Sequence, residues 1–179
     1  KSTDDKRYRE ALLKGVELML KSQYENGGWP QGPNAGGYAR YITFNDGAMI
    51  GVMTTLRDMT GDRKAYPFID DMMRARCRKA VDKGIGCILK CQIVVDGKRT
   101  AWCAQHDEKT LVPRKARSYE LPSISGAESV GVVRFLMEID EPSPEIIAAV
   151  QGAVRWFDEA KLTGIREIRK EAKGTPKGY

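Results

Sequence analysis

The sequence lacks the features of a membrane-spanning chain. Its longest apolar runs fall far short of the roughly eighteen residues that a membrane span needs. Residues 1–9 are almost entirely polar, so they do not read as a secretory signal. We therefore expect the chain to begin like a mature protein or like a fragment of a longer one.

Several classes of catalytic site are also missing. His106 is the only histidine, which excludes a metal site built from three histidines. The four cysteines, Cys77, Cys87, Cys91 and Cys103, lack the paired C-x-x-C ends of a zinc site, and we expect buried thiols rather than a disulfide or a metal site. There is no Walker A or G-x-G-x-x-G phosphate loop, and no serine or cysteine stands in a nucleophile elbow.

What the chain does contain is typical of a globular protein. Its 179 residues suit one domain with a hydrophobic core, and the balance of 41% hydrophobic to 30% charged residues argues against disorder. The net charge of +6 fits an acidic partner, which by charge alone is a nucleic acid, an anionic surface or a polyuronate.

Hydrophobic periodicity predicts helices along most of the chain. They are expected at residues 12–24, 45–61, 68–92, 125–142 and 144–164. Asn45 or Asp46 is expected to cap the second helix and Ser125 the fourth. Residues 93–95 are the best strand candidate, so the fold class is predicted to be all-α.

A repeat indicates how these helices are organised. The pattern K-G-V…L-K-x-Q of residues 14–23 recurs as K-G-I…L-K-x-Q in residues 83–92, 69 positions later. Each copy is followed by a loop with a tryptophan and then a glutamine, Trp29 with Gln31 and Trp102 with Gln105. Helix pairs that repeat at this period predict an α/α array, either a solenoid or a closed toroid; chance similarity between amphipathic helices is the alternative.

Three loop regions hold most of the polar residues and are the expected place of function, at residues 27–44, 96–125 and 161–179. In the first, the aromatic rings of Trp29 and Tyr38 beside Arg40 suit a sugar that carries a carboxylate. Trp29 equally suits a plug for the core. Asn45 and Asp46 equally suit helix caps and nothing more.

The second loop is denser in such groups. His106 and Asp107 are adjacent, a pair that can supply acid–base chemistry. The carboxylates of this loop are scattered among arginines, which suits calcium together with an anionic substrate, because hard cations prefer oxygen ligands and arginine binds the remaining charge. Surface salt bridges would give the same pattern.

Five strings in these loops resemble the family 10 pectate lyases. They are GGWPQ (27–31), ITFND (42–46), WCAQHD (102–107), ARSYE (116–120) and SGAES (125–129), in this order, within a resemblance that runs from about residue 8 to 166. The resemblance implies an (α/α)3 toroid made of one domain over residues 1–179, with a wide groove between its loops. It also implies a secreted or periplasmic protein that cleaves polygalacturonate by calcium-dependent β-elimination.

The resemblance also assigns roles. Arg117 is the arginine expected to take the C5 proton, and Asp46 is expected to be the main calcium ligand, with Asp107 a further contributor. The residues expected to bind substrate are Trp29, Tyr38, Arg40, Asn45, Trp102, His106 and Tyr119. A free guanidinium rarely gives up its proton, so without cationic neighbours Arg117 would bind a carboxylate instead. The expected partner is a pectate oligosaccharide and not a nucleic acid or a membrane, and a monomer is expected.

Two departures from the family pattern bear on activity. Gly47 stands where the family tends to have asparagine or aspartate, and glycine has no side chain to ligate a metal. Family members continue beyond the ending at residues 173–179 with more arginine motifs, so a truncated form is expected. A non-catalytic polyuronate-binding module is therefore the alternative function, and a third is an unrelated helical-repeat protein that binds nucleic acid through a basic face.

Overall fold

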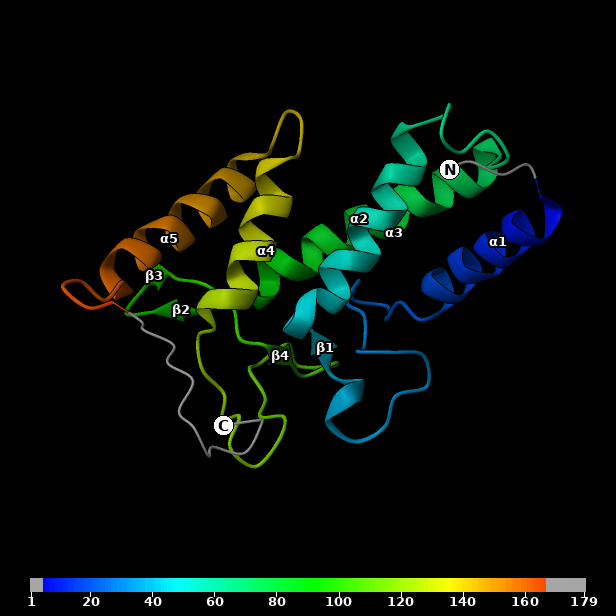
Figure 1. The fold of residues 1–179 in the computed structure, drawn as a ribbon. Coiled ribbons are helices and arrows are strands. Elements are labelled where there is room, and N and C mark those ends of the chain that lie inside the picture. Colours follow the sequence, from blue (N-terminus) through cyan, green and yellow to red (C-terminus); the bar gives the residue numbers. More distant parts are fainter. Residues whose placement is uncertain (1–4, 167–179) are drawn as a thin grey trace, which may run out of the picture.

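The computed structural model describes residues 5–166, so the predictions for the ending at residues 173–179 and for most of the third loop lie outside it. Five helices dominate (Figure 1): α1 (Lys6–Lys21), α2 (Ala48–Gly61), α3 (Asp71–Cys91), α4 (Gly126–Met137) and α5 (Pro144–Ala160). Two short 3₁₀ turns, η1 (Gly37–Arg40) and η2 (Asn45–Gly47), precede α2. None of the helices in this part of the chain is both long and apolar enough for a membrane span.

Three of the five described helices begin with a side-chain cap, but α2 and α4 do not: Ser125 is the N-cap residue of α4, as predicted, yet its side chain makes no capping hydrogen bond. Side chains of Asp70 and Ser143 accept hydrogen bonds from the first turns of α3 and α5. The prediction that Asn45 or Asp46 caps α2 is wrong, because Gly47 is the N-cap residue, at φ +68°, and no side chain bonds the first turn. The backbone turns through η2 before α2 starts, which moves both polar side chains out of capping range.

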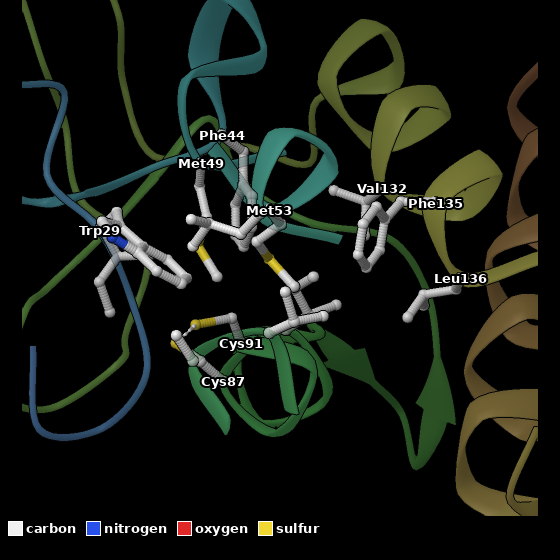
Figure 2. Close-up of a cluster of buried hydrophobic side chains, with 14 of the residues drawn as sticks. Trp29, Phe44, Met49, Met53, Cys87, Cys91, Val132, Phe135 and Leu136 are labelled. Atoms are coloured by element: carbon white, nitrogen blue, oxygen red, sulfur yellow. Dashed lines mark hydrogen bonds between the residues drawn. The ribbon is translucent and has the colours of Figure 1, made fainter. Parts of the chain in front are cut away.

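Helix α3 is the centre of the array. It packs most extensively on α2 and also contacts α1 and α5, while α4 packs on α2 and α5. Figure 2 shows the resulting core, in which aromatic rings from the loops, methionines of α2 and residues of α4 meet α3. All four cysteines are buried and free, as expected; Cys87 and Cys91, one helical turn apart, have their Sγ atoms 4.0 Å apart.

The repeat is visible in the hydrogen bonds of its members. Gln23 donates through Nε2 to the carbonyls of Gly27 and Ala80, so it joins the loop after α1 to α3. Gln92, 69 positions later, donates in the same way to the carbonyls of Thr100 and Ala149, which joins the loop after α3 to α5. Gln23 and Gln92 hold equivalent positions in the repeat, and each anchors a loop to a later helix, α3 for Gln23 and α5 for Gln92.

The two tryptophans also make equivalent hydrogen bonds. The indole Nε1 of Trp29 donates to the carbonyl of Met19 at 2.8 Å, and that of Trp102 donates to the carbonyl of Ile88 at 2.8 Å. Met19 and Ile88 hold equivalent positions near the ends of α1 and α3. Chance similarity would not reproduce these partners, so the sequence repeat is a structural repeat.

The part of the chain that the structure describes has four strands of two residues each, all of them in the loops. Strand β1 (Ile42–Thr43) pairs antiparallel with β4 (Gln105–His106), and β2 (Val94–Val95) pairs with β3 (Lys98–Arg99). Asp96 and Gly97, both at positive φ, form the tight turn between β2 and β3, next to the predicted strand. The fold is thus helix-rich, and the sheet structure serves only to shape the loops.

The closed (α/α)3 toroid stays a prediction. In Figure 1 the described helices form an open array, with α1 and α5 at opposite ends of it. The loops around β1 and β4 gather on one side of this array, where α2 also begins.

A buried arginine holds the connection between α2 and α3. Arg74 is 1% exposed and meets only backbone carbonyls: Nε donates to Ile69 at 3.1 Å, Nη2 donates to Tyr66 at 2.6 Å, and Nη1 donates to Met59 and, at 3.4 Å, to Thr60. Met59 and Thr60 lie in the last turn of α2, where carbonyls lack partners within the helix. The guanidinium therefore satisfies both the helix end and the connecting loop.

We expect Arg74→Met to lower the free energy of unfolding by about 2–4 kcal/mol, because several buried carbonyls lose their donor. Arg76→Met is the matched control, since Arg76 lies on the same helix but pairs with Glu17 at the surface. Urea unfolding should give a much smaller loss for the control. Equal losses for the two variants would show that Arg74 has no special role.

Candidate functional site

The two polar loops named from the sequence meet through strands β1 and β4. Besides the strand pairing, the carbonyl of Ala104 accepts hydrogen bonds from the backbone N–H groups of Phe44 and Asn45, at 2.9 and 3.1 Å. A pocket of about 330 Å³ opens beside this junction. It is lined by Asn45, Cys103, Ala104, Gln105, Arg114, Tyr119, Glu120, Leu121, Ser123, Ser125 and Glu128. The first and second polar loops therefore meet at one place in the structure.

Asp46 stands exposed at this junction in an unusual backbone conformation. Its φ of +53° lies in the left-handed region, which costs a non-glycine residue about 1 kcal/mol or more. Its Oδ2 accepts a hydrogen bond from the amide of Asn45 at 2.7 Å. Since Asp46 does not cap α2, its carboxylate is available to a ligand.

Both carboxylate oxygens of Asp107, the second predicted calcium ligand, already accept hydrogen bonds from the protein. Its Oδ1 accepts from the N–H groups of Lys109 and Thr110, at 3.0 and 2.8 Å, and its Oδ2 accepts from Arg114. The N–H group of Thr110, with further help from Lys109 and Arg114, holds the pKa of the Asp107 carboxyl well below its usual range. The carboxylate therefore shapes the loop of residues 107–114.

The described residues do not by themselves fit a resident calcium ion. Calcium takes about six to eight oxygen ligands. Within residues 5–166, no three histidine, cysteine, aspartate or glutamate side chains come together in a way that could hold a metal. Asp46 with its neighbour Asn45 offers a small part of a coordination shell, and Asp107 adds nothing to it in this structure.

Three of the predicted substrate-binding residues are buried. Trp29 and Trp102 are 1% and 0% exposed, and both lie in the core cluster. For Trp29 the structure shows the alternative reading, a plug for the core, and Trp102 is its repeat equivalent. His106 is also fully buried, so none of the three has surface to offer a sugar. A single sequence identifies an aromatic residue in a loop but not the side to which the ring turns.

His106 instead stabilises the loop. Its Nε2 accepts from the N–H of Cys103 at 3.1 Å, and its Nδ1 lies 2.8 Å from the carbonyl of Leu111, so the neutral ring carries its proton on Nδ1. The ring also packs edge-on against Phe44, with ring centroids 5.7 Å apart. Burial lowers the pKa of His106, which keeps it neutral near pH 7.

Arg40 and Tyr38 lie at the surface of the first loop, as a binding role requires. Tyr38 is 39% exposed, and Arg40 is half exposed, with its Nε donating to Glu108 at 3.0 Å. The guanidinium of Arg40 lies 5.0 Å from the ring centroid of Tyr41. The Glu108 carboxylate raises the pKa of Arg40, so this group is a permanent cation.

Arg117 is exposed, and a neighbouring carboxylate holds it. Its Nε donates to Glu120 Oε2 at 2.9 Å, and its Nη2 donates to Oε1. Its guanidinium also lies 5.2 Å from the ring centroid of Tyr119, an exposed aromatic residue. Glu120 raises the pKa of Arg117, while Arg117 lowers that of Glu120 to about 2. A proton-accepting arginine needs the opposite setting.

The pocket adds residues that sequence reasoning did not single out. Glu120 and Glu128 stand inside two of the family-like strings, so a signal for them existed. Arg114 lies between the strings and had none, because its importance comes from its contact with Asp107. The hydroxyl of Ser125 donates to the carboxylate of Glu128 at the start of α4.

Comparisons with known proteins agree with these strings. Residues 1–177 match the family model described as pectic acid lyase. Among solved structures, a family 10 polysaccharide lyase from Cellvibrio cellulosa is similar, at 41% identity over 88% of this chain and with a TM-score of 0.84. A mutant of that lyase in complex with trigalacturonic acid is similar to the same degree. The chain spans about half the length of these proteins, 49% and 50%. No curated protein matches.

The buried histidine makes a prediction about pH. Its pKa is lower in the folded chain than the ordinary value of about 6.5, so the unfolded chain binds the proton more readily. Stability should therefore be fully present above about pH 6.5 and fall as the pH drops towards the folded-state pKa, by at most about 1.4 kcal/mol per pH unit.

Urea unfolding of the wild type and of His106→Asn between pH 8 and pH 5 tests this. Asparagine can donate to Leu111 but does not titrate, so the variant should lose the slope in that window while being less stable at pH 8. A slope that survives in His106→Asn would place its origin elsewhere, since the chain has one histidine.

Proposed function

The chain belongs to the pectic acid lyase family, and from this membership we propose that it takes part in cleaving polygalacturonate by calcium-dependent β-elimination. The observation that carries the proposal is the junction of the two loops. It brings four of the five family-like strings around one pocket, in a chain 41% identical to a polysaccharide lyase whose mutant was solved with trigalacturonic acid. A secreted or periplasmic location and a monomeric state go with this proposal.

The reaction explains which residue types the pocket needs. The proton at C5 of a galacturonate lies next to a carboxylate and is very weakly acidic while that group keeps its charge. Cations at the carboxylate stabilise the charge that develops when the proton leaves. Arginines 40, 114 and 117 stand around the loop junction as permanent cations.

For Arg117 we propose the binding of a substrate carboxylate in the first place. Its exposed guanidinium beside Tyr119 supports this role, since a sugar ring can stack on the tyrosine while its carboxylate meets the arginine. The base role that the family resemblance assigns would require Glu120 to move away and cations to take its place.

The negative charge at the pocket is the reason why calcium is part of the proposal. Glu120 and Glu128 line it, Asp46 stands next to it, and the substrate is itself a polyanion. A divalent cation between them would offset this repulsion and would polarise the substrate carboxylate when bound. Asp46 is the residue proposed to contact the ion, and the substrate would supply further oxygen ligands.

A second function is kept because two observations favour it. Gly47 offers no ligand beside Asp46, and Glu120 raises the pKa of the proposed base Arg117. Both suit a non-catalytic module that binds polyuronate. This alternative shares the substrate and the pocket with the lyase and differs only in turnover.

The function is tested by incubating the protein with polygalacturonate and calcium and following the absorbance of the unsaturated uronate product. We expect product with calcium and none with chelator. Arg117→Ala should abolish turnover with only weakened binding if Arg117 is the base, but raise KM more than it lowers kcat if Arg117 binds a carboxylate. Binding without product at any calcium level would support the module, and the absence of both would contradict the proposal.

Asp46 and Gly47 give a paired prediction for calcium. Asp46→Ala should raise the calcium concentration for half-maximal trigalacturonate binding steeply. Gly47→Asp should lower it, because a Cβ there would meet open space and the added carboxylate can ligate, although the φ of +68° costs aspartate about 1 kcal/mol of stability. Asp58→Ala, on the surface of α2, is the control. An unchanged calcium requirement in both variants would move the metal to another place.

A further inference from the structure

We propose that Arg114 is a further substrate-binding residue, which takes a uronate carboxylate in the pocket, and that Asp107 positions it. This inference rests on the proposed function and refines its site. It also gives Asp107 a role other than the calcium ligand that the family resemblance implied.

The backbone of Arg114 is fixed at the end of the loop of residues 107–114. Its N–H donates to the carbonyl of Gln105 at 3.0 Å, so the residue lies against strand β4. Its own carbonyl lies 3.8 Å from the Sγ of Cys103. Pro113, just before it, forms a bridge with the buried His106. Arg114 is therefore attached to the core through the same strand that joins the two loops.

The guanidinium of Arg114 is held by one carboxylate oxygen. Both Nε and Nη2 lie 2.9 Å from Asp107 Oδ2, while Asp107 Oδ1 is bound to two backbone N–H groups. Asp107 is 7% exposed, so it forms a rigid support. A guanidinium has five N–H donors, and the Asp107 contacts leave the others without a partner among the residues that the structure describes.

The exposed part of the Arg114 side chain borders the space that a ligand would enter. The Arg114 side chain is 47% exposed and lines the pocket beside Asn45, the neighbour of Asp46. Tyr41 lies behind it, with the ring centroid 6.0 Å from the guanidinium. The arrangement presents an oriented cation whose support is buried, which suits a carboxylate better than a mobile lysine would.

Arg117 does not offer the same opportunity in this structure. Glu120 contacts the same two nitrogens of Arg117, Nε and Nη2, that Asp107 contacts on Arg114, but the Arg117 side chain is not part of the pocket lining. Arg114 can accept a carboxylate without giving up Asp107. Among the described arginines, Arg114 is also the one that lines this pocket.

The test is calorimetric titration of the protein with trigalacturonate in the presence of calcium. Arg114→Gln should weaken binding roughly ten-fold, the loss expected for a charge-assisted hydrogen bond. Arg63→Gln is the matched control, since Arg63 also pairs with a carboxylate, Asp71, but lies outside the pocket. We expect it to bind like the wild type.

Asp107→Asn separates the positioning role from the shape of the loop. Asparagine keeps an oxygen for the N–H groups of Lys109 and Thr110, but its amide cannot accept from Arg114. We expect a loss of affinity close to that of Arg114→Gln, and no further loss in the double variant, because the two residues act as one unit. The calcium concentration for half-maximal binding should stay unchanged in Asp107→Asn.

Each result counts for or against the inference. If Arg114→Gln binds like Arg63→Gln, Arg114 does not touch substrate, and the inference fails while the proposed function stands. If the losses add in the double variant, or if Asp107→Asn raises the calcium requirement, Asp107 does not act through Arg114. If the wild type does not bind trigalacturonate, the proposed function fails and takes this inference with it.

Arg114→Lys distinguishes a loss of binding caused by a disordered loop from one caused by the missing guanidinium. Lysine keeps the charge and can reach Asp107, but it lacks the planar fork. We expect wild-type unfolding in urea and an affinity between those of wild type and Arg114→Gln. Wild-type stability together with wild-type affinity would overturn the requirement for a guanidinium.

Discussion

Two pairs, each of a glutamine and a buried tryptophan, are what the loops of this protein depend on. Gln23 with Trp29, and Gln92 with Trp102, donate hydrogen bonds from the loops to helix carbonyls, which gives these side-chain N–H groups partners away from water. Loss of such a bond leaves a polar group unsatisfied in the core, which costs more than the bond itself contributes. The loops therefore keep one path, and strands of only two residues suffice to join them.

At the surface, each arginine of the candidate site forms an ion pair with an acidic residue near it. Glu108 holds Arg40, Asp107 holds Arg114 and Glu120 holds Arg117. The three supports differ in burial and geometry. Buried Asp107 contacts Nε and Nη2 of Arg114 through one oxygen, whereas the more exposed Glu120 contacts Nε and Nη2 of Arg117 through both oxygens. The excess of basic residues in the chain thus does not translate into a uniformly positive pocket.

Much of this was predictable from the sequence, and the failures have physical causes. Periodicity and caps located the five helices, and the spacing of Gln and Trp revealed the repeat. That Asp46 does not cap α2 was not predictable, because the path of the chain before α2 depends on hydrogen bonds to the carbonyl of Ala104. The burial of Trp29, Trp102 and His106 depends on neighbours distant in the chain. Asp107 looked like a metal ligand because nothing in the sequence pairs it with Arg114, seven positions on.

The repeat also suggests how such a site could arise. Its two halves stand at equivalent places in two copies of one unit, so an ancestral duplication would have delivered two loops with the same internal fastening. The glutamines and tryptophans that anchor the loops bond to the helices, while the charged residues of the candidate site face solvent. These two sets of residues could then change independently. One copy carries an exposed carboxylate at Asp46 and the other carries arginines at Arg114 and Arg117. A single ancestral frame would thus have come to hold different charged residues in its two copies.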